Sequence, residues 1–291
     1  MIPFDLAQPS SLAEAVGLLK ADDPSIRPIA GGTAVMLMLK SGLFRPTTLV
    51  SLRGIEPEFR SVAATAEGGL ALGAMVPLAA LEKSSAVRSV APVIAETMRT
   101  LSNIRVRNVA TVGGALAHAD PHMDLPPVLM ALDARATVTG AGGERILDIG
   151  SLLRGYYETA LGTDELVSRV TVPSQRGWRS AYLKCTTRAA DDWPALGIAV
   201  SLRMEADTIR EARLVLGAAA DKATRLGGAE AVLAGTAGED RVLSQAGEAA
   251  AAEASIIADN QGSAAYKRQL LRVYLGRAVR RALAAPEGGA A

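Results

Sequence analysis

Short apolar runs fill the first 175 residues, and their spacing switches repeatedly between the period of strands and that of helices. A helix is predicted to begin after Ser11, because Ser11 and Glu14 have the spacing of a capping box. The other apolar runs predict strands at 27–30, 48–52, 70–72, 135–139, 145–149 and 166–172. Helices are predicted after the glycines at 31–32, at 77–81, as one buried face across 87–101, and at 126–132.

The pattern changes after the segment Pro173–Gly177, which is typical of a linker. Three strands are predicted at 179–184, 195–204 and 209–217, followed by Ala-rich helices near 222–234, 239–258 and 263–284. Strands followed by helices, without alternation, indicate a separate α+β domain. We therefore predict one domain over 1–175, with subdomains of about 1–56 and 57–175, and a second over 178–285.

The charge balance narrows the choice of partners and location. With 31 basic and 30 acidic residues, the chain has no basic excess to neutralise a phosphate backbone, so we expect no nucleic acid partner. We also expect no membrane span, since no apolar run reaches the roughly 18 residues needed. The first residues lack the pattern of a signal peptide, which favours a cytoplasmic protein.

Cysteine usage excludes several kinds of site. Cys185 is the single cysteine, so a disulfide, a cysteine zinc site and a four-thiolate iron–sulfur cluster are excluded within this chain. His118 and His122 could at most begin a metal site with Asp120 and Asp124. Redox chemistry would therefore need an organic cofactor.

Two turns, Ala30–Thr33 and Thr111–Gly114, each place two glycines beside a hydroxyl residue. Glycine lets the backbone approach a ligand closely and point successive N–H groups at an anion. The two turns could therefore bind a pyrophosphate from both sides. Either turn alone is more often a plain tight turn, and neither has the spacing of a Rossmann fingerprint or a Walker A loop. The pattern by itself indicates a phosphate-binding α/β protein.

Further residues around these turns make the chain similar to a known family. The turns, followed by Asp120-Pro121 and Asp124-Leu125-Pro126, resemble the FAD-binding subunits of molybdenum hydroxylases, including carbon monoxide dehydrogenase medium subunits and the xanthine dehydrogenase flavin domain. The resemblance extends to Ile2–Asp5, Ile104–Asn108, and the late motif Lys184, Arg188 and Asp191–Trp193. It implies an α+β fold, with a two-subdomain FAD-binding domain of vanillyl-alcohol oxidase type and a small domain of three antiparallel strands and a helix bundle.

The resemblance also implies a site for non-covalent FAD, extended between the two subdomains with its pyrophosphate on the glycine turns. Asp124 is expected to bond a flavin or ribitol donor, and Lys184 to favour the anionic reduced flavin. Trp193 is expected to shield one flavin face, the alternative being a core tryptophan at the domain junction. Carried over, the cofactor-binding residues are Ile29, Ala30, Gly31, Gly32, Thr33, Ala34, Val35, Met36, Leu101, Thr111, Val112, Gly113, Gly114, Ala115, Asp124, Leu166, Lys184 and Trp193.

Several other residues are expected to contribute less directly to the site. The family usually has Asn where Ala115 stands, so backbone donors must replace a side-chain amide there. His118 and His122 are expected to have structural roles or to support the residues that contact the cofactor. Cys185 is expected to be a buried small residue. The last predicted helix has a basic face, which is interpreted as solvated; a subunit contact is the alternative. This face consists of Arg268, Arg272, Arg277, Arg280 and Arg281.

The function implied is electron transfer within a larger complex. A large molybdopterin-binding subunit would oxidise the substrate and a small subunit would carry two [2Fe–2S] clusters, the whole forming a dimer of heterotrimers. This chain would pass electrons through FAD to NAD, a quinone or oxygen, and would not act on substrate alone. The alternatives are a stand-alone flavin oxidase of vanillyl-alcohol type and a flavin-free assembly protein of the same fold.

Overall fold

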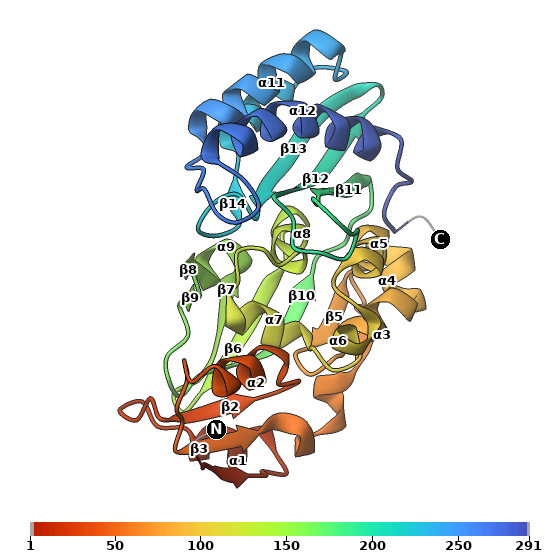
Figure 1. Cartoon of the computed structure of the whole chain (residues 1–291). Coiled ribbons are helices and arrows are strands. Elements are labelled where there is room, and N and C mark those ends of the chain that lie inside the picture. Colours follow the sequence, from red (N-terminus) through yellow and green to blue (C-terminus); the bar gives the residue numbers. More distant parts are fainter. Residues whose placement is uncertain (1–2, 290–291) are drawn as a thin grey trace.

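The structure is a computed structural model that describes residues 3–289, so Ile2 of the motif Ile2–Asp5 lies outside the described residues. It consists of three parts stacked along one axis (Figure 1). The N-terminal subdomain occupies one end, a middle subdomain follows, and the C-terminal domain occupies the other end. Within residues 3–289, no helix combines the length and the apolarity that a membrane crossing requires.

The N-terminal subdomain is a small parallel sheet with the strand order β1-β3-β2. Its strands and helices are β1 (Asp5–Ala7), α1 (Leu12–Leu18), β2 (Ile26–Ile29), α2 (Thr33–Lys40) and β3 (Thr48–Ser51). The predicted N-terminal cap of α1 is confirmed, because the Glu14 amide donates to Ser11 Oγ over 3.1 Å. The Glu14 carboxylate accepts from the Ser10 amide instead of completing the box on Ser11. Short 3₁₀ turns at Leu52–Gly54 and Pro57–Arg60 lead into the middle subdomain.

The middle subdomain is built on a five-stranded antiparallel sheet with helices packed against it. The sheet runs in the order β4 (Val62–Ala64), β5 (Leu70–Gly73), β10 (Leu166–Val172), β6 (Arg135–Gly140) and β7 (Gly143–Asp148). Its helices are α3 (Leu78–Lys83), α4 (Ser85–Val90), α5 (Pro92–Thr100), α6 (Ile104–Arg107), α7 (Val112–His118), α8 (Leu125–Ala131) and α9 (Ile149–Leu152). A two-stranded ribbon of β8 (Leu153–Gly155) and β9 (Glu158–Thr159) completes it.

The single buried helix face predicted across 87–101 is divided between two helices. α4 ends at Val90 and α5 begins at Pro92. Proline disfavours a helical conformation in the residue before it, and Ala91 accordingly takes φ −141° and ψ 69°. The apolar positions of the segment are nevertheless all buried, so the prediction of burial is confirmed and that of one continuous helix is wrong.

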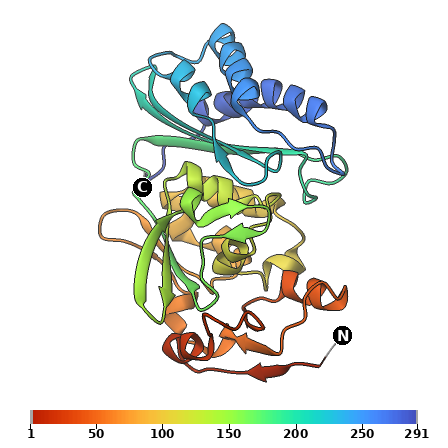
Figure 2. The same cartoon turned by 90° about the vertical axis from the view of Figure 1, so that its left-hand side faces the viewer.

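The C-terminal domain is a four-stranded antiparallel sheet, β11-β12-β13-β14, with helices on one face (Figure 2). Its elements are β11 (Trp178–Cys185), β12 (Leu196–Glu205), β13 (Thr208–Gly217), β14 (Thr224–Arg225), α10 (Gly227–Leu233), α11 (Asp240–Glu253) and α12 (Ala264–Leu283). The prediction of three strands therefore missed β14. Its two residues pair with Val215 and Leu216 before α10 begins, in a segment whose composition favoured helix.

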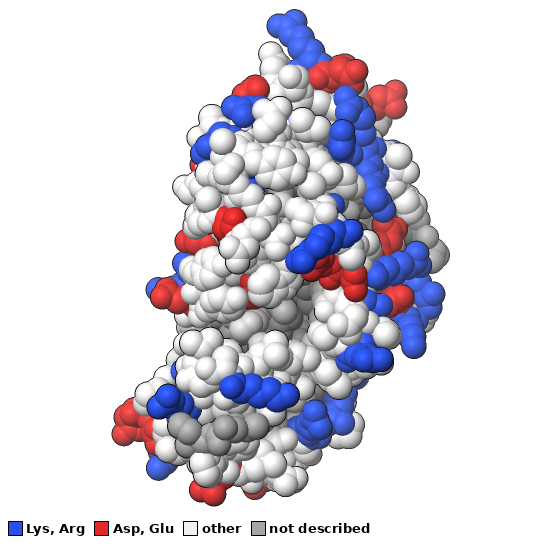
Figure 3. Space-filling model, in the orientation of Figure 1, with Lys and Arg blue, Asp and Glu red and all other residues white. Residues whose placement is uncertain are grey.

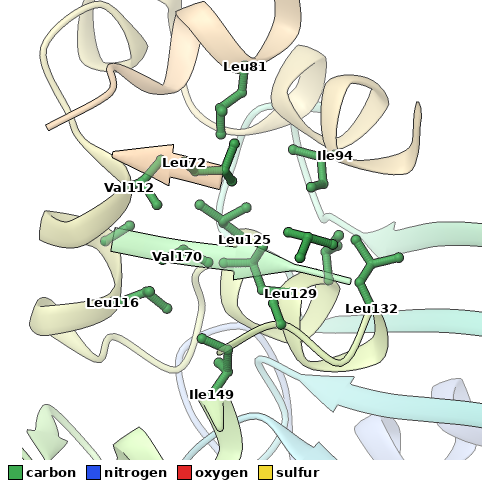
Figure 4. Packing of buried hydrophobic residues seen from close by; sticks show 14 of the residues in the cluster. Leu72, Leu81, Ile94, Val112, Leu116, Leu125, Leu129, Leu132, Ile149 and Val170 are labelled. Atoms are coloured by element: carbon green, nitrogen blue, oxygen red, sulfur yellow. The ribbon is translucent and has the colours of Figure 1, made fainter. Parts of the chain in front are cut away.

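The hydrophobic core of the middle subdomain extends onto one face of the C-terminal sheet, with α8 at its centre, and a second core lies between that sheet and its own helices. Leu125, Leu129 and Leu132 point into this core beside Leu72 and Val170 of the middle sheet (Figure 4). Tyr182, Ala199 and Val215 of the C-terminal sheet belong to the same cluster. Each fully buried leucine stabilises the fold by about 1.5–3 kcal/mol, so the junction between the two parts is firmly packed.

Candidate functional site

The two glycine turns lie against each other, although they are far apart in the sequence. A β-carbon built on Gly31 would overlap the Val109 carbonyl oxygen and lie 2.7 Å from its carbon and 3.0 Å from Ala110 Cα. The same position on Gly114 would lie 3.9 Å from Ala30 Cβ. Glycine at position 31 is therefore required for the close approach of the first turn to the second.

Each turn begins a helix. Gly32 is the N-cap of α2 with φ 77°, a left-handed conformation that glycine adopts without strain. Thr111 is the N-cap of α7, and its Oγ1 accepts a hydrogen bond from the Gly114 amide over 3.1 Å. The first N–H groups of a helix lack partners within the helix and carry partial positive charge. In α7 they are engaged by the protein, because the Val112 amide donates to the Val76 carbonyl and the Gly113 amide to the Ala74 carbonyl. The start of α2 is therefore the turn that presents donors suited to an anion.

A cleft of about 510 Å³ opens beside the first turn. The hollow between the N-terminal subdomain and the parts above it has mostly uncharged walls (Figure 3). Arg53 is a charged side chain on the cleft wall and could balance a phosphate. The cleft is otherwise lined by Phe4, Leu6, Gln8, Pro9, Ser10, Ile29, Ala30, Gly31, Gly32, Met36, Leu49, Ser51 and Gly54.

Helix α2 leaves much of its apolar surface uncovered. Of its eight residues only Leu39 is buried, and Leu37 is 68% exposed. Surface helices of globular proteins normally cover such a stripe with the core. The half-exposed residues Thr33–Met36 thus offer an apolar wall beside the glycine turn, and Met36 lines the cleft.

Asp124 lies at the junction of the middle subdomain and the C-terminal domain, almost fully buried. Tyr182 Oη donates to its Oδ1 over 2.6 Å, and Lys184 Nζ donates to its Oδ2 over 2.9 Å. Burial raises the pKa of Asp124, and the charge of Lys184 opposes that rise. The carboxylate thus already accepts hydrogen bonds from two protein donors. A bond from Asp124 to a flavin donor stays a prediction.

Lys184 connects three parts of the predicted site. Besides Asp124, its ammonium donates to the carbonyl oxygens of Thr100, over 2.7 Å, and of Asp192, over 3.2 Å. These carbonyls directly precede Leu101 and Trp193 in the chain. The structure therefore brings together the positions 101, 124, 184 and 193 that were predicted from segments far apart. The ion pair with Asp124 also cancels part of the positive charge expected of Lys184.

Trp193 is 55% exposed, so the alternative of a core tryptophan is wrong. Its indole stacks on the His122 imidazole, with ring centroids 5.2 Å apart and an interplanar angle of 10°. His122 itself is buried, with Nδ1 3.1 Å from Asp120 Oδ1 and Nε2 2.9 Å from Asp259 Oδ2. No signal in the sequence pointed to Asp259, because it lies in the loop between α11 and α12.

The remaining predicted positions lie in the interior near the turns. Ala115 is buried on α7, and Leu166 is buried in the cluster against which Ala30 packs. Cys185 is buried and free, as expected. Among residues 3–289, no group of three or more histidine, cysteine or acidic side chains is arranged to hold a metal ion.

Most basic side chains of α12 form ion pairs or other contacts with groups of this same chain. Arg272 pairs with Glu248 over 2.8 Å, Arg280 with Asp240 over 2.6 Å, and Arg281 lies 3.7 Å from Glu96. Arg277 lies over the Tyr274 ring. A subunit contact by this helix stays a prediction.

Comparison with known proteins links this geometry to flavoproteins. The family described as FAD binding domain in molybdopterin dehydrogenase matches residues 2–175, and that described as CO dehydrogenase flavoprotein C-terminal domain matches residues 181–282. The carbon monoxide dehydrogenase medium chain of Afipia carboxidovorans is 33% identical over 288 residues, covering 98% of this chain and 99% of that one. The nicotine 6-hydroxylase medium subunit of Paenarthrobacter nicotinovorans is 31% identical over 274 residues, covering 94% and 95% respectively.

A solved structure agrees over nearly the whole fold. Reconstituted CO dehydrogenase from Oligotropha carboxidovorans contains a chain that superposes with a TM-score of 0.93 at 32% identity. The match covers 98% of this chain and 100% of that one.

Proposed function

Because this chain belongs to the FAD-binding medium subunits of molybdenum hydroxylases, we propose that it relays electrons from an iron–sulfur partner subunit through FAD to an external acceptor. It is a flavin electron-transfer subunit of the molybdopterin dehydrogenase class. We assign FAD to a domain at 1–175, with subdomains of about 1–56 and 57–175, followed at 178–285 by a C-terminal domain of the carbon monoxide dehydrogenase flavoprotein type.

The close packing of the two glycine turns beside an open cleft carries this proposal. The turns leave no room for a β-carbon at Gly31, and the start of α2 presents helix N-terminal N–H groups where a pyrophosphate needs donors. The uncovered apolar side of α2 and the cleft beside it suit the remainder of an extended dinucleotide. FAD supplies the chemistry when bound, accepting electrons one at a time and delivering two.

The protein's own residues bind and shield the cofactor in this proposal. Thr33 and Thr111 lie at the helix starts that hold the pyrophosphate, and Arg53 on the cleft wall adds a positive charge. Lys184 holds the chain at Thr100 and Asp192 beside the flavin. The partly exposed indole of Trp193 covers a flavin face and limits access of the acceptor.

The partners follow from the same proposal. A large molybdopterin-binding subunit oxidises the substrate, and a small subunit with [2Fe–2S] clusters delivers the electrons. The relatives named above are medium chains of such multi-subunit enzymes. We propose a dimer of heterotrimers in which this chain is inactive towards the substrate when alone.

Purification of the chain from its native host, with identification of what accompanies it, tests the proposal. Molybdopterin-containing and iron–sulfur chains should co-purify together with acid-releasable FAD. A chain that is isolated alone with flavin that reacts directly with substrate and oxygen would favour a stand-alone oxidase. A chain isolated alone and colourless would favour an assembly protein.

A further inference from the structure

We propose that His122 is a positioning residue for Trp193: its ring packs against the indole, and its bonds to Asp120 and Asp259 fix that ring across the junction between the middle subdomain and the C-terminal domain. The inference rests on the proposed function insofar as the indole covers the flavin. The contact between the two rings is a property of the chain itself, so it can be tested without the flavin reaction.

The bonds of His122 define its charge. Both ring nitrogens face carboxylates, Nδ1 towards Asp120 and Nε2 towards Asp259. A carboxylate can only accept, and a neutral imidazole has only one N–H to donate. The imidazolium form alone satisfies both partners. Lys267, fully buried on α12, donates to the same Asp259 carboxylate and holds it in place.

Asp120 and Asp259 come from different parts of the molecule. Asp120 lies between α7 and α8 in the middle subdomain, and Asp259 lies between α11 and α12 in the C-terminal domain. His122 therefore bridges the junction with its two bonds. A shift of the α11–α12 loop relative to α8 would break one bond and move the surface on which Trp193 stacks.

The pKa values of His122 and of its two carboxylate partners shift in opposite directions. Burial alone would lower the pKa of His122, but the hydrogen bonds and charges of Asp120 and Asp259 outweigh it and raise that pKa. Burial likewise acts against ionisation of these two acids, yet their bonds to His122 and Lys267 lower both pKa values.

The other neighbours stay neutral near pH 7. Burial lowers the pKa of His118, whose ring lies against that of Tyr157 at an interplanar angle of 52° and not on the indole. Burial first, then the charge of Asp120, raises the pKa of Tyr156, and raises that of Tyr157 to about 12. His122 is thus the group in this cluster that loses its charge as the pH rises above the ordinary histidine range.

The sign of the pH effect follows from this raised value. The imidazolium persists below the ordinary histidine pKa of about 6.5 and somewhat above it, and its contribution is lost as pH rises through the folded-state pKa. A cation beneath a partly exposed indole favours the stacked arrangement by roughly two- to fivefold. Loss of the proton should therefore release Trp193 from His122 by about that factor.

The chain allows a direct measurement, since it contains only two tryptophans and two histidines. A Trp178→Phe background leaves Trp193 as the one tryptophan. Its emission and its quenching by iodide are measured from about pH 5 to about pH 9, roughly two units on either side of neutral. An imidazolium quenches an adjacent indole more strongly than a neutral imidazole does. Emission should rise in one step above the ordinary histidine range, with iodide access increasing roughly two- to fivefold.

Two variants identify the residue responsible. His122→Gln should abolish the step, and the matched control His118→Gln should retain it. Persistence of the step in H122Q, or a flat profile while the His122 ring protons titrate by NMR, would overturn the inference. If H122Q does not fold, Asp259→Asn removes one of the two anions and should move the step to lower pH, whereas an unmoved step counts against the inference. FAD measured in the same samples separates this result from the proposed function, because a colourless protein that shows the step refutes only the latter.

Discussion

Replacement of Gly31 by alanine tests the contact between the two glycine turns. The added methyl group would overlap the Val109 carbonyl oxygen and lie 2.7 Å from the carbonyl carbon, where ordinary contacts begin at 3.4 Å. All of the obstructing atoms belong to the backbone of Val109 and Ala110, so no side-chain rotation can relieve the overlap. The two turns must therefore separate by on the order of an ångström, since a packed interior has no free volume to absorb the methyl.

The size of the effect follows from the cost of such overpacking. An extra methyl in a packed site costs about 1–3 kcal/mol. If a cofactor held by both turns requires their native spacing, this cost appears in its binding free energy. Because 1.4 kcal/mol corresponds to a factor of ten, the Kd for FAD should increase by roughly 5- to 150-fold.

The assay is a titration of the apoprotein with FAD, followed by flavin fluorescence, together with thermal unfolding of the same samples. Gly17→Ala is a matched control, because nothing lies within 4 Å of a β-carbon at this position of α1. The control should bind FAD like the unaltered chain and gain up to about 1 kcal/mol of helix stability. If Gly31→Ala also binds FAD with the unaltered Kd, the cofactor does not depend on the junction of the turns and the reasoning is refuted.

Two further substitutions probe the same site. Lys184→Met should lower the free energy of unfolding by about 3 kcal/mol, because it leaves the buried Asp124 without its cation; urea denaturation measures this, and Lys184→Arg should lose clearly less. An unchanged stability in the methionine variant would mean that the pair is not needed to hold the junction. Thr111→Val should lose about 1 kcal/mol, since the cap bond to the Gly114 amide disappears. In FAD titrations Thr111→Val should bind more weakly than Thr111→Ser, and equal affinities would argue against a role for the hydroxyl.

Local patterns predicted most of the elements, because capping and periodicity are encoded within a few residues. Ser11 caps α1 as expected, and the apolar positions of 87–101 are buried as expected. The break at Pro92 was missed because the apolar spacing continues across it. The strand β14 was missed because two residues carry too short a pattern, and only pairing with Val215 and Leu216 defines it.

The candidate site was predictable only where its residues resemble a known family. The glycine turns could be named, but their mutual contact depends on the packing of two subdomains. Asp124 was expected to bond a flavin or ribitol donor, but its protein partners Tyr182 and Lys184 could not be predicted, because they lie on a strand of the other domain. The stack of Trp193 on His122 joins two loops, and no periodicity in the sequence relates one loop to another.

The position of α8 between two domains limits how such proteins can exchange parts during evolution. Its leucines share a core with Tyr182 and Val215, and Pro127 would lie 3.0 Å from a β-carbon on Gly217. A recombination event that replaced only 178–285 would set a foreign strand against an unmatched helix, at the cost of voids or overlaps. Functional chimeras between relatives should therefore exchange residues 120–132 together with the C-terminal domain. These two segments form the unit that recombination can exchange without disturbing the junction.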